Sequence, residues 1–347
     1  MTRVKIAIIV SLTAMAVVLA GCGGMAERPP SDLTVMTYNL YIGTELAGLF
    51  AVTDPAQLLA VVDGMYNSVV ASNVPGRLAA IAKAVKEERP HFIGLQEVSV
   101  IRHQANPELN FREILMSALE AEGLNYKVAA VIENASINLF GSGVTDYDLI
   151  LARSDVEMAR TASATYTTLL PLQLPIPGGD FKVKRGYAAV DATVGGVTYR
   201  VVNTHLETTL EALPEAQKQA MQAIRGAQAR ELVDSLSEEE LPVILLGDFN
   251  TPAPDGPAYQ LLLAAGYMDA WQQDAAGSGN TCCQAADLRN EMSELYMRID
   301  QIFVKGVKLR ESASIRTATV GDKPEDRLAT GQWPSDHAGV VAHLPVE

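Results

Sequence analysis

Residues 242–252 have the sequence Pro-Val-Ile-Leu-Leu-Gly-Asp-Phe-Asn-Thr-Pro, and this stretch decides how the rest of the chain is interpreted. Its apolar run, Pro242 to Leu246, predicts a strand that is buried on both faces and ends in a loop. Because side chains alternate along an extended chain, we expect Asp248 and Asn250 to point to one side and Phe249 into the protein. A carboxylate can hold a metal or orient a water, and an amide can contact a phosphoryl oxygen without adding negative charge.

Five other apolar runs also carry polar residues at one end. The polar end of residues 242–252 is therefore one of six strand ends that could form a common site. The other five runs are Leu33–Asn39, His91–Glu97, Val201–Leu206 with His205, Arg298–Val304 with Asp300, and Ala338–Leu344, preceded by Ser335-Asp336-His337. Taken singly, each polar residue has an ordinary alternative explanation, such as a strand-end cap, a turn, a solvated terminus or a core imidazole. Together, they predict that amides, carboxylates and imidazoles meet at the ends of six strands.

In this order, the residues resemble the endonuclease/exonuclease/phosphatase superfamily. Its pattern is Asn, then Gln-Glu, then a strand with His or Tyr, then Gly-Asp-x-Asn, then a strand with Asp, then Ser-Asp-His. The resemblance covers residues 33–344, nearly all of the mature chain. It implies an α/β fold in which a two-sheet β-sandwich is flanked by helices, giving four layers, α/β/β/α. Because the site residues span the whole length, we expect one domain, residues 33–347.

The resemblance also implies a divalent metal, Mg²⁺ or Mn²⁺, and a metal-dependent phosphoric ester hydrolase. It makes Glu97 the principal metal ligand, with Asn39 beside it and Asp336 on the metal side. Oxygen ligands from carboxylates and amides suit such hard cations. Hydrolysis of a phosphoester needs this neutralising cation, a positioned water and help for the leaving oxygen.

The remaining residues of the pattern are implied to act on the water and the phosphate. Asp248 is expected to orient the nucleophilic water and Asn250 to bind the phosphate. His205 and His337 are expected to bind the scissile phosphate, and Asp300 to orient His337. An imidazole paired with an acid has its charged form stabilised, as a phosphate ligand requires.

Two assignments stay open at this stage. The acid that pairs with His205 is either Asp146 or Asp148, which precede it in the pattern. Arg185 and Arg298 could reach the phosphate, although a single arginine is more often a surface residue in an ion pair.

The N-terminus predicts export. Residues 1–20 have Arg3 and Lys5 followed by an apolar run that is too short for a dependable membrane span. Leu19-Ala20-Gly21-Cys22 resembles the bacterial lipobox, which implies a signal peptide over 1–21, lipidation of Cys22 and a tether over 22–32. The alternative is an ordinary cleaved signal followed by an unmodified cysteine. We therefore expect an exported bacterial lipoprotein of the cell envelope, attached to the membrane through Cys22.

Composition bears on the substrate. The chain has 347 residues and a formal charge of −14, and removal of residues 1–21 takes away Arg3, Lys5 and no acid, which gives −16. No run of basic residues is present, whereas tight nucleic-acid binding needs clustered Lys and Arg. We therefore expect a lipid headgroup or a small phosphoester as substrate, and a monomer. The alternatives are an extracellular endonuclease of the same superfamily and a non-catalytic binding module that kept the fold.

The intervening segments give further expectations. Residues 41–73 form an insertion in which Asp54-Pro55 starts a helix with Leu58, Leu59, Val62 and Met65 on one face. Further helices are expected around 78–85, 111–119 and 214–236, strands over 126–132 and 148–152, and a hairpin over 188–202 that turns at Gly195-Gly196. The proline-rich segment 169–180 is expected to be an exposed loop without regular structure. Cys282 and Cys283 are either a vicinal disulfide or two buried thiols.

Overall fold

The computed structural model describes residues 32–45, 48, 52, 54–139, 141–173, 180–209, 213–273, 277–311 and 313–347. The predicted signal peptide, Cys22 and all of the tether except Asp32 lie outside these residues and stay predictions. Among the helices so described, none is long and apolar enough to span a bilayer.

The first sheet contains both ends of the described chain. Its order is β15-β16-β1-β2-β6-β3-β4, and β5 also pairs with β6. The strands β1 and β2 are parallel, and their other pairings are antiparallel. The bounds are β1 Leu33–Asn39, β2 Phe92–Gln96, β3 Val100–His103, β4 Asn106–Asn110, β5 Tyr126–Leu139, β6 Ser142–Arg153, β15 Arg316–Val320 and β16 Gly339–Leu344.

The second sheet contains the strand of residues 242–252 at its centre. Its order is β13-β14-β12-β11-β10-β7. The bounds are β7 Glu157–Thr165, β10 Gly186–Val194, β11 Val197–His205, β12 Val243–Asp248, β13 Met268–Asp269 and β14 Asp300–Lys305. The predicted hairpin is present as β10–β11, and both glycines of its turn have positive φ, as a two-residue hairpin turn requires.

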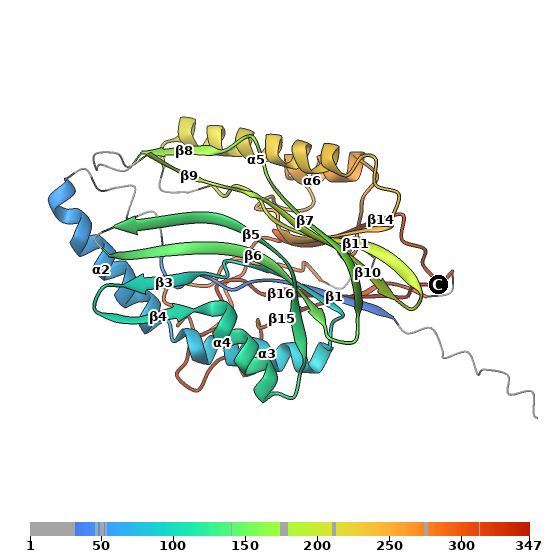
Figure 1. Cartoon of the computed structure of the whole chain (residues 1–347), viewed down its shortest axis with the longest axis horizontal. Helices are drawn as coiled ribbons and strands as arrows, with labels where there is room; N and C mark the ends of the chain where they lie inside the picture. The colour runs from blue at the N-terminus through green and yellow to red at the C-terminus, as the bar shows by residue number, and fades with distance from the viewer. Residues whose placement is uncertain are drawn as a thin grey trace, which may run out of the picture.

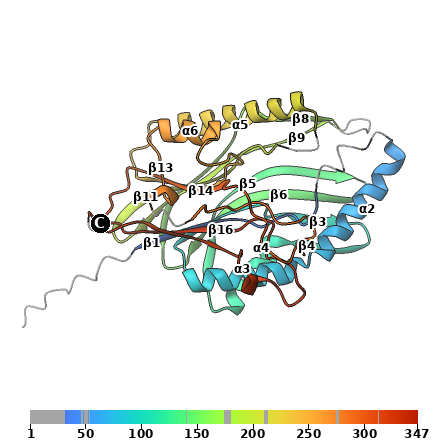
Figure 2. The same cartoon turned by 180° about the vertical axis from the view of Figure 1, so that it is seen from behind.

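The two sheets pack face to face, and helices cover their outer faces (Figures 1 and 2). Apolar side chains of both sheets, such as Ile150, Val190 and Ile244, form the core between them. The helices α3 (Val74–Glu88) and α4 (Phe111–Ala121) pack on the first sheet, and α5 (Glu215–Ser235) and α6 (Pro257–Ala264) pack on the second. This arrangement confirms the four-layer α/β/β/α sandwich.

The inserted helix α2 (Pro55–Ala71) lies at one end of the molecule, opposite the C-terminus (Figure 1). The predicted helix is therefore present, but its predicted apolar face is only partly correct. Leu58 is fully buried, whereas Leu59 has 40% of its surface exposed, because one residue of a helix is turned about 100° from the next.

Segment 169–180 differs from its prediction as an irregular loop. Its described parts include β8 (Leu170–Gln173) and, from residue 180, β9 (Asp180–Val183), and the two strands form a separate antiparallel pair. Pro171, which has no backbone N–H, fits in β8 because the strand belongs to a two-stranded ribbon. Each strand of such a ribbon has one edge that pairs with no neighbour.

A polar contact ties the two sheets together below the strand ends. Gln96 Nε2 of β2 donates to Asn203 Oδ1 of β11 over 2.6 Å, and Asn203 Nδ2 donates to the carbonyls of Leu95 and Leu149 over 2.9 and 3.1 Å. Gly94 makes room for this contact, because a Cβ there would lie 2.6 Å from Asn203 Oδ1. The tie fixes the ends of β2 and β11 relative to each other, and both strands deliver site residues.

Candidate active site

Strand register brings the predicted site residues together from distant parts of the sequence. Asn39 is paired with Gln96 across the parallel strands β1 and β2, so Glu97 follows directly beside it. In the second sheet, Asp248 lies between His205 of β11 and Asp300 of β14, its register partners on either side. The strand ends thus form one polar site at a common edge of the sandwich.

Glu97 and Asp248 are joined through the amide of Asn39. Asn39 Nδ2 lies 3.2 Å from Glu97 Oε1 and 3.2 Å from Asp248 Oδ2. The other oxygen of Glu97 accepts the backbone N–H of Ile42 over 2.7 Å. Glu97 has a φ of 56°, a conformation that ends β2 and turns the side chain toward Asn39. Asn39 therefore positions two carboxylates and lies directly beside Glu97.

The side chain of Asn250 does not follow the strand alternation that was predicted to place it beside that of Asp248. Strand alternation stops at Asp248, where β12 ends, and Asn250 has a φ of 50°, which is left-handed. The backbone N–H of Asn250 donates to Asp248 Oδ1 over 2.9 Å, and its side-chain Nδ2 donates to the Leu206 carbonyl over 3.0 Å. Asn250 thus reaches the site through a tight turn. Phe249 is fully buried against Phe303, as expected.

His337 and Asp300 form a buried pair, which agrees with the orienting role implied for Asp300. His337 Nδ1 lies 2.7 Å from Asp300 Oδ2. Burial alone would lower the pKa of His337, but the carboxylates of Asp300 and Asp336 outweigh it and raise that pKa well above its usual range. His337 is therefore an imidazolium at neutral pH, with its other ring nitrogen, Nε2, available as a donor.

Of the two candidate acids, Asp146 and Asp148, the structure places Asp148 nearer to His205 Nδ1. Asp148 Oδ1 lies 3.9 Å from His205 Nδ1, whereas Asp146 accepts from Ser99 over 2.7 Å and from Asn134 over 3.4 Å. Burial, and then the positive charge of Arg185, lower the pKa of His205 well below its usual range. Burial and the charge of Asp146 raise the pKa of Asp148. His205 is thus a neutral imidazole whose Nε2 lies 3.4 Å from Asp248 Oδ2.

The carboxylates of the site fit a divalent cation. Burial, and then the charge of Asp300, raise the pKa of Asp248 to about 7. Burial also raises the pKa of Asp336 to about 6, with Glu97 adding to the effect and His337 opposing it. Carboxylates crowded in this way repel one another, and oxygen donors of this kind suit Mg²⁺ or Mn²⁺. Glu97 and Asp336 are the residues that would hold such an ion.

The two candidate arginines have different positions. Arg298 is buried in an ion pair with Asp269, Nη2 to Oδ2 2.7 Å, and is thereby committed to the scaffold. Arg185 has 9% of its surface exposed, and its Nε has no hydrogen-bond partner in the described chain. Although burial opposes it, the charges of Glu207, Asp148 and other site carboxylates raise the pKa of Arg185. Arg185 is thus a cation within the site.

Three residues that support the site are missing from the sequence-based set. Arg77, on α3, is fully buried and donates to backbone carbonyls on both sides of the site, including those of Leu40 and Pro334. Ser335 Oγ donates to the Asn39 carbonyl over 2.8 Å, and Thr281 Oγ1 accepts the Asp300 backbone N–H over 3.1 Å. Ser335 belongs to the Ser335-Asp336-His337 motif, and Arg77 stands out as a charged residue on the apolar face marked by Val74, Leu78 and Ile81, whereas Thr281 leaves no signal in the sequence.

The adjacent cysteines lie next to the same histidine. Cys282 and Cys283 are joined in a vicinal disulfide, the first of the two alternatives given by the sequence. Cys282 also forms an isolated β-bridge with His337. The disulfide therefore belongs to the wall behind His337.

Fold and site together define the class of protein: an α/β sandwich with an acidic, histidine-containing site at its strand ends. The model of the endonuclease/exonuclease/phosphatase family matches residues 36–337, and the chain belongs to this family. Members of the family are generally metal-dependent phosphodiesterases or nucleases. No curated protein sequence matches the chain.

Solved structures agree with the fold. An endonuclease/exonuclease/phosphatase protein from Beutenbergia cavernae is similar at 20% identity with a TM-score of 0.55, over 91% of this chain and 72% of that one. A family protein from Bacteroides thetaiotaomicron gives 19% identity and a TM-score of 0.55, over 92% and 99% of the two chains. Truncated TDP2 from Caenorhabditis elegans gives 18% and 0.52, over 91% and 98%.

Proposed function

We propose that this chain is a divalent-metal-dependent phosphoester hydrolase, exported and lipid-anchored, that acts on a lipid headgroup or a small phosphoester. One observation carries the catalytic part of the proposal. Glu97, Asp248 and His337, from three strand ends, are each fixed by a specific partner around one site: Asn39, Asn250 and Asp300. Such a constellation supplies a cation ligand, a base and a phosphate-binding cation together.

The residues divide the work of hydrolysis between them. A bound cation would neutralise charge on a phosphoryl oxygen. Asp248, with a pKa raised to about 7, accepts a proton from the attacking water. The water oxygen bonds to phosphorus, and the bond to the leaving oxygen breaks with its electron pair. His337, held charged by Asp300, donates a hydrogen bond to the phosphoryl oxygen that gains negative charge. His205 and Arg185 complete the walls that hold the phosphate.

The preference for a lipid-linked or small ester rests on charge and on the predicted anchor. A formal charge of −14, or −16 after removal of Arg3 and Lys5, repels polyanions within a Debye length of about 8 Å at physiological salt. Lipidation of Cys22 would hold the site near a bilayer and raise its effective concentration toward headgroups. Neither effect helps long nucleic acid.

A substrate panel tests the proposal. The domain from Ser31 onward is incubated with sphingomyelin, phosphatidyl lipids, single- and double-stranded DNA and small phosphodiesters, each with Mg²⁺ and with excess chelator. We expect metal-dependent hydrolysis, with kcat/KM for a lipid or small ester above that for DNA. Activity that persists in excess chelator contradicts the mechanism. If kcat/KM for DNA exceeds that for every ester tested, the protein is instead an endonuclease of the same superfamily.

A separate experiment tests the anchor. Cys22→Ser is expected to release the protein from the membrane fraction or to leave it unprocessed. Intact-mass analysis of the wild type gives the decisive result, because a mature chain without lipid on Cys22 contradicts the anchored location.

A further inference from the structure

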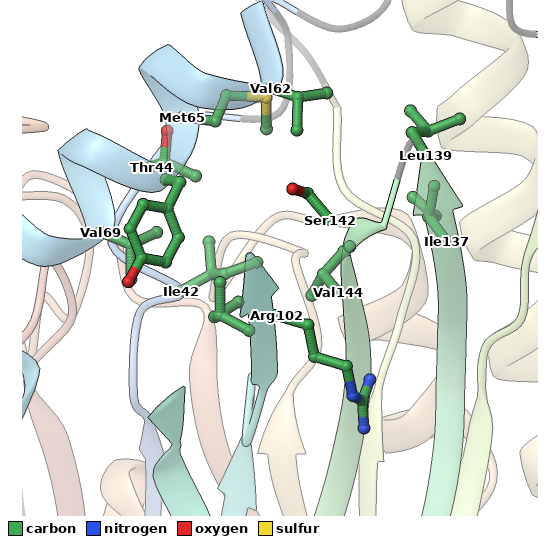
Figure 3. Close-up of a pocket in the computed structure, with 13 residues that line it drawn as sticks. Ile42, Thr44, Val62, Met65, Val69, Arg102, Ile137, Leu139, Ser142 and Val144 are labelled. Atoms are coloured by element: carbon green, nitrogen blue, oxygen red, sulfur yellow. The ribbon is translucent and has the colours of Figure 1, made fainter. Parts of the chain in front are cut away.

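An apolar groove lies between the inserted helix α2 and the strands β3, β5 and β6 (Figure 3). Its space is about 560 Å³ including the part open to solvent, of which about 60 Å³ can take the centre of a water-sized sphere. We call it the α2 groove; its apolar lining includes Ile42, Val62, Met65, Ile101, Leu139 and Val144.

One wall of the groove contacts a residue of the site. Ile42, in its wall, donates its N–H to Glu97 Oε2 over 2.7 Å, so the groove begins beside the principal metal ligand. Ile101 of β3 follows Glu97 by four residues and pairs in register with Val144 of β6, which precedes Asp146 by two. The segments that deliver the site's carboxylates thus continue as the floor of the groove.

The lining fits a hydrocarbon chain better than a ring. Aliphatic side chains of α2, Val62 and Met65, lie across from those of the strands (Figure 3). A nucleobase would seek an aromatic face to stack on, and the one aromatic lining residue, Tyr66, is already stacked on His103 with ring centroids 4.4 Å apart. A flexible methylene chain needs only apolar contact, which this lining provides along its length.

We propose that the α2 groove binds the hydrocarbon chain of the phosphoester substrate while its phosphate lies at the site of Glu97 and His337. This inference rests on the proposed function for the phosphate end and narrows its substrate to an ester with an alkyl or acyl chain. It gives the insertion 41–73 a role in substrate selection, because α2 supplies one whole wall of the groove.

Chain-length dependence of binding tests the proposal. Calorimetry with Mg²⁺ present compares ethyl, butyl, hexyl and octyl phosphate, all below their critical micelle concentrations. We expect affinity to rise by about fourfold for each methylene that becomes fully buried, and to level off once the groove is filled. Equal affinity for all four phosphates overturns the proposal.

Two valines of α2 provide a matched pair of variants. Val62→Asn places an amide in the groove and is expected to flatten the chain-length dependence, whereas Val70→Asn changes a residue with 52% exposure outside the lining and should keep it. Met65→Gln, which conserves volume, repeats the test if Val62→Asn does not fold. A wild-type slope in folded Val62→Asn or Met65→Gln overturns the proposal.

Hydrolysis of methyl p-nitrophenyl phosphate by the same preparations separates this proposal from the function on which it rests. If the ester is hydrolysed in a metal-dependent way but alkyl phosphates of all chain lengths bind equally well, the groove proposal is wrong and the proposed function stands. Chain-length-dependent binding without hydrolysis of any ester overturns the function and supports the groove.

Discussion

The scaffold around Arg77 and the site around Asp148 both bury polar side chains, but they differ in how completely those side chains are hydrogen-bonded. Arg77 is fully buried, and its three nitrogens donate to Ser72 O and Oγ and to the carbonyls of Leu40, Tyr41 and Pro334. The amide of Asn203, equally buried, is likewise satisfied on both its oxygen and its nitrogen.

In the site, comparable burial leaves polar atoms without partners. Both oxygens of Asp148, Nδ1 of His205, Oδ1 of Asp300 and Nε of Arg185 have no hydrogen-bond partner among the described residues. Burial of such atoms costs free energy that Arg77 and Asn203 avoid. Arg77 and Asn203 are therefore satisfied by the chain itself, whereas a bound cation and phosphate would complete the unpartnered atoms of the site.

The largest expected effect is on the scaffold side. Arg77→Met should lower the free energy of unfolding by about 3–5 kcal/mol, because several buried carbonyls lose their donors while the apolar side chain fills the space. Urea unfolding measures the change. Arg112→Met, at an exposed position of α4, is the control and should change stability by less than about 0.5 kcal/mol. Equal effects of the two substitutions would mean that the buried hydrogen bonds of Arg77 do not stabilise the fold.

On the site side, the large effect should be on activity. Asp248→Asn and His337→Ala should each lower kcat by on the order of a hundredfold or more, and the double variant by much less than the product. Stability of Asp248→Asn should be unchanged or higher, because one of several repelling carboxylates is removed. Asp255→Asn, exposed in the following loop, is the control. A variant that unfolds more easily and keeps kcat would show that Asp248 is structural.

Arg185 in the site and Arg298 in the scaffold allow the same comparison between two residues of one type. Arg185→Gln should lower kcat/KM by about ten- to a hundredfold, the value of a charge-assisted hydrogen bond to phosphate. Arg298→Gln should instead lower stability, because it leaves Asp269 buried without its cation. Kinetics and urea unfolding of both variants decide the matter, and the opposite pattern contradicts the assignment of Arg185 to the site.

The smallest expected effect is a pH dependence from a scaffold histidine. Burial, and then the charge of Arg153, lower the pKa of His91 to about 4, and its Nδ1 accepts the Thr34 N–H over 3.1 Å. The unfolded chain, with a pKa of about 6.5, binds the proton first, so this contribution is complete above that pH and is lost as pH falls toward 4. Between pH 7 and 5 the loss should be about 2 kcal/mol.

His91→Asn is the matched variant, because the amide oxygen can accept the same hydrogen bond without titrating. Unfolding in chelator at several pH values should show a shallower loss of stability for the variant than for the wild type. Identical slopes would mean that His91 titrates equally in the folded and unfolded chains.

The strand ends were predictable because each of their strands is a short apolar run in a sandwich core, and such runs end where polar residues begin. The order of Asn39, Glu97, His205, Asp248, Asp300 and Asp336-His337 therefore located the site. The extension of β5 and β6 to Leu139 and Ser142 was not predictable, since this part of the hairpin has many half-exposed and polar residues and lacks a continuous apolar run.

Features that depend on contacts between distant segments of the chain could not be predicted from the sequence. The choice of Asp148 over Asp146 depends on which carboxylate already has partners. The turn at Asn250 depends on the Leu206 carbonyl, just after β11, which accepts a hydrogen bond from Asn250 Nδ2. The role of Arg77 could not be predicted, because its carbonyl acceptors lie far apart in the sequence, from residue 40 to residue 334, and come together only in the fold.

The most direct measurement follows thermal unfolding of the wild type and Asp336→Asn, first in excess chelator and then with increasing Mg²⁺. If the buried carboxylates repel one another until a cation binds, the variant unfolds in chelator at the same temperature as the wild type or at a higher one. The wild type then gains stability with Mg²⁺ by mass action, and the variant gains clearly less. A wild type that does not respond to Mg²⁺ or Mn²⁺, or a variant that is less stable than the wild type in chelator, contradicts the account.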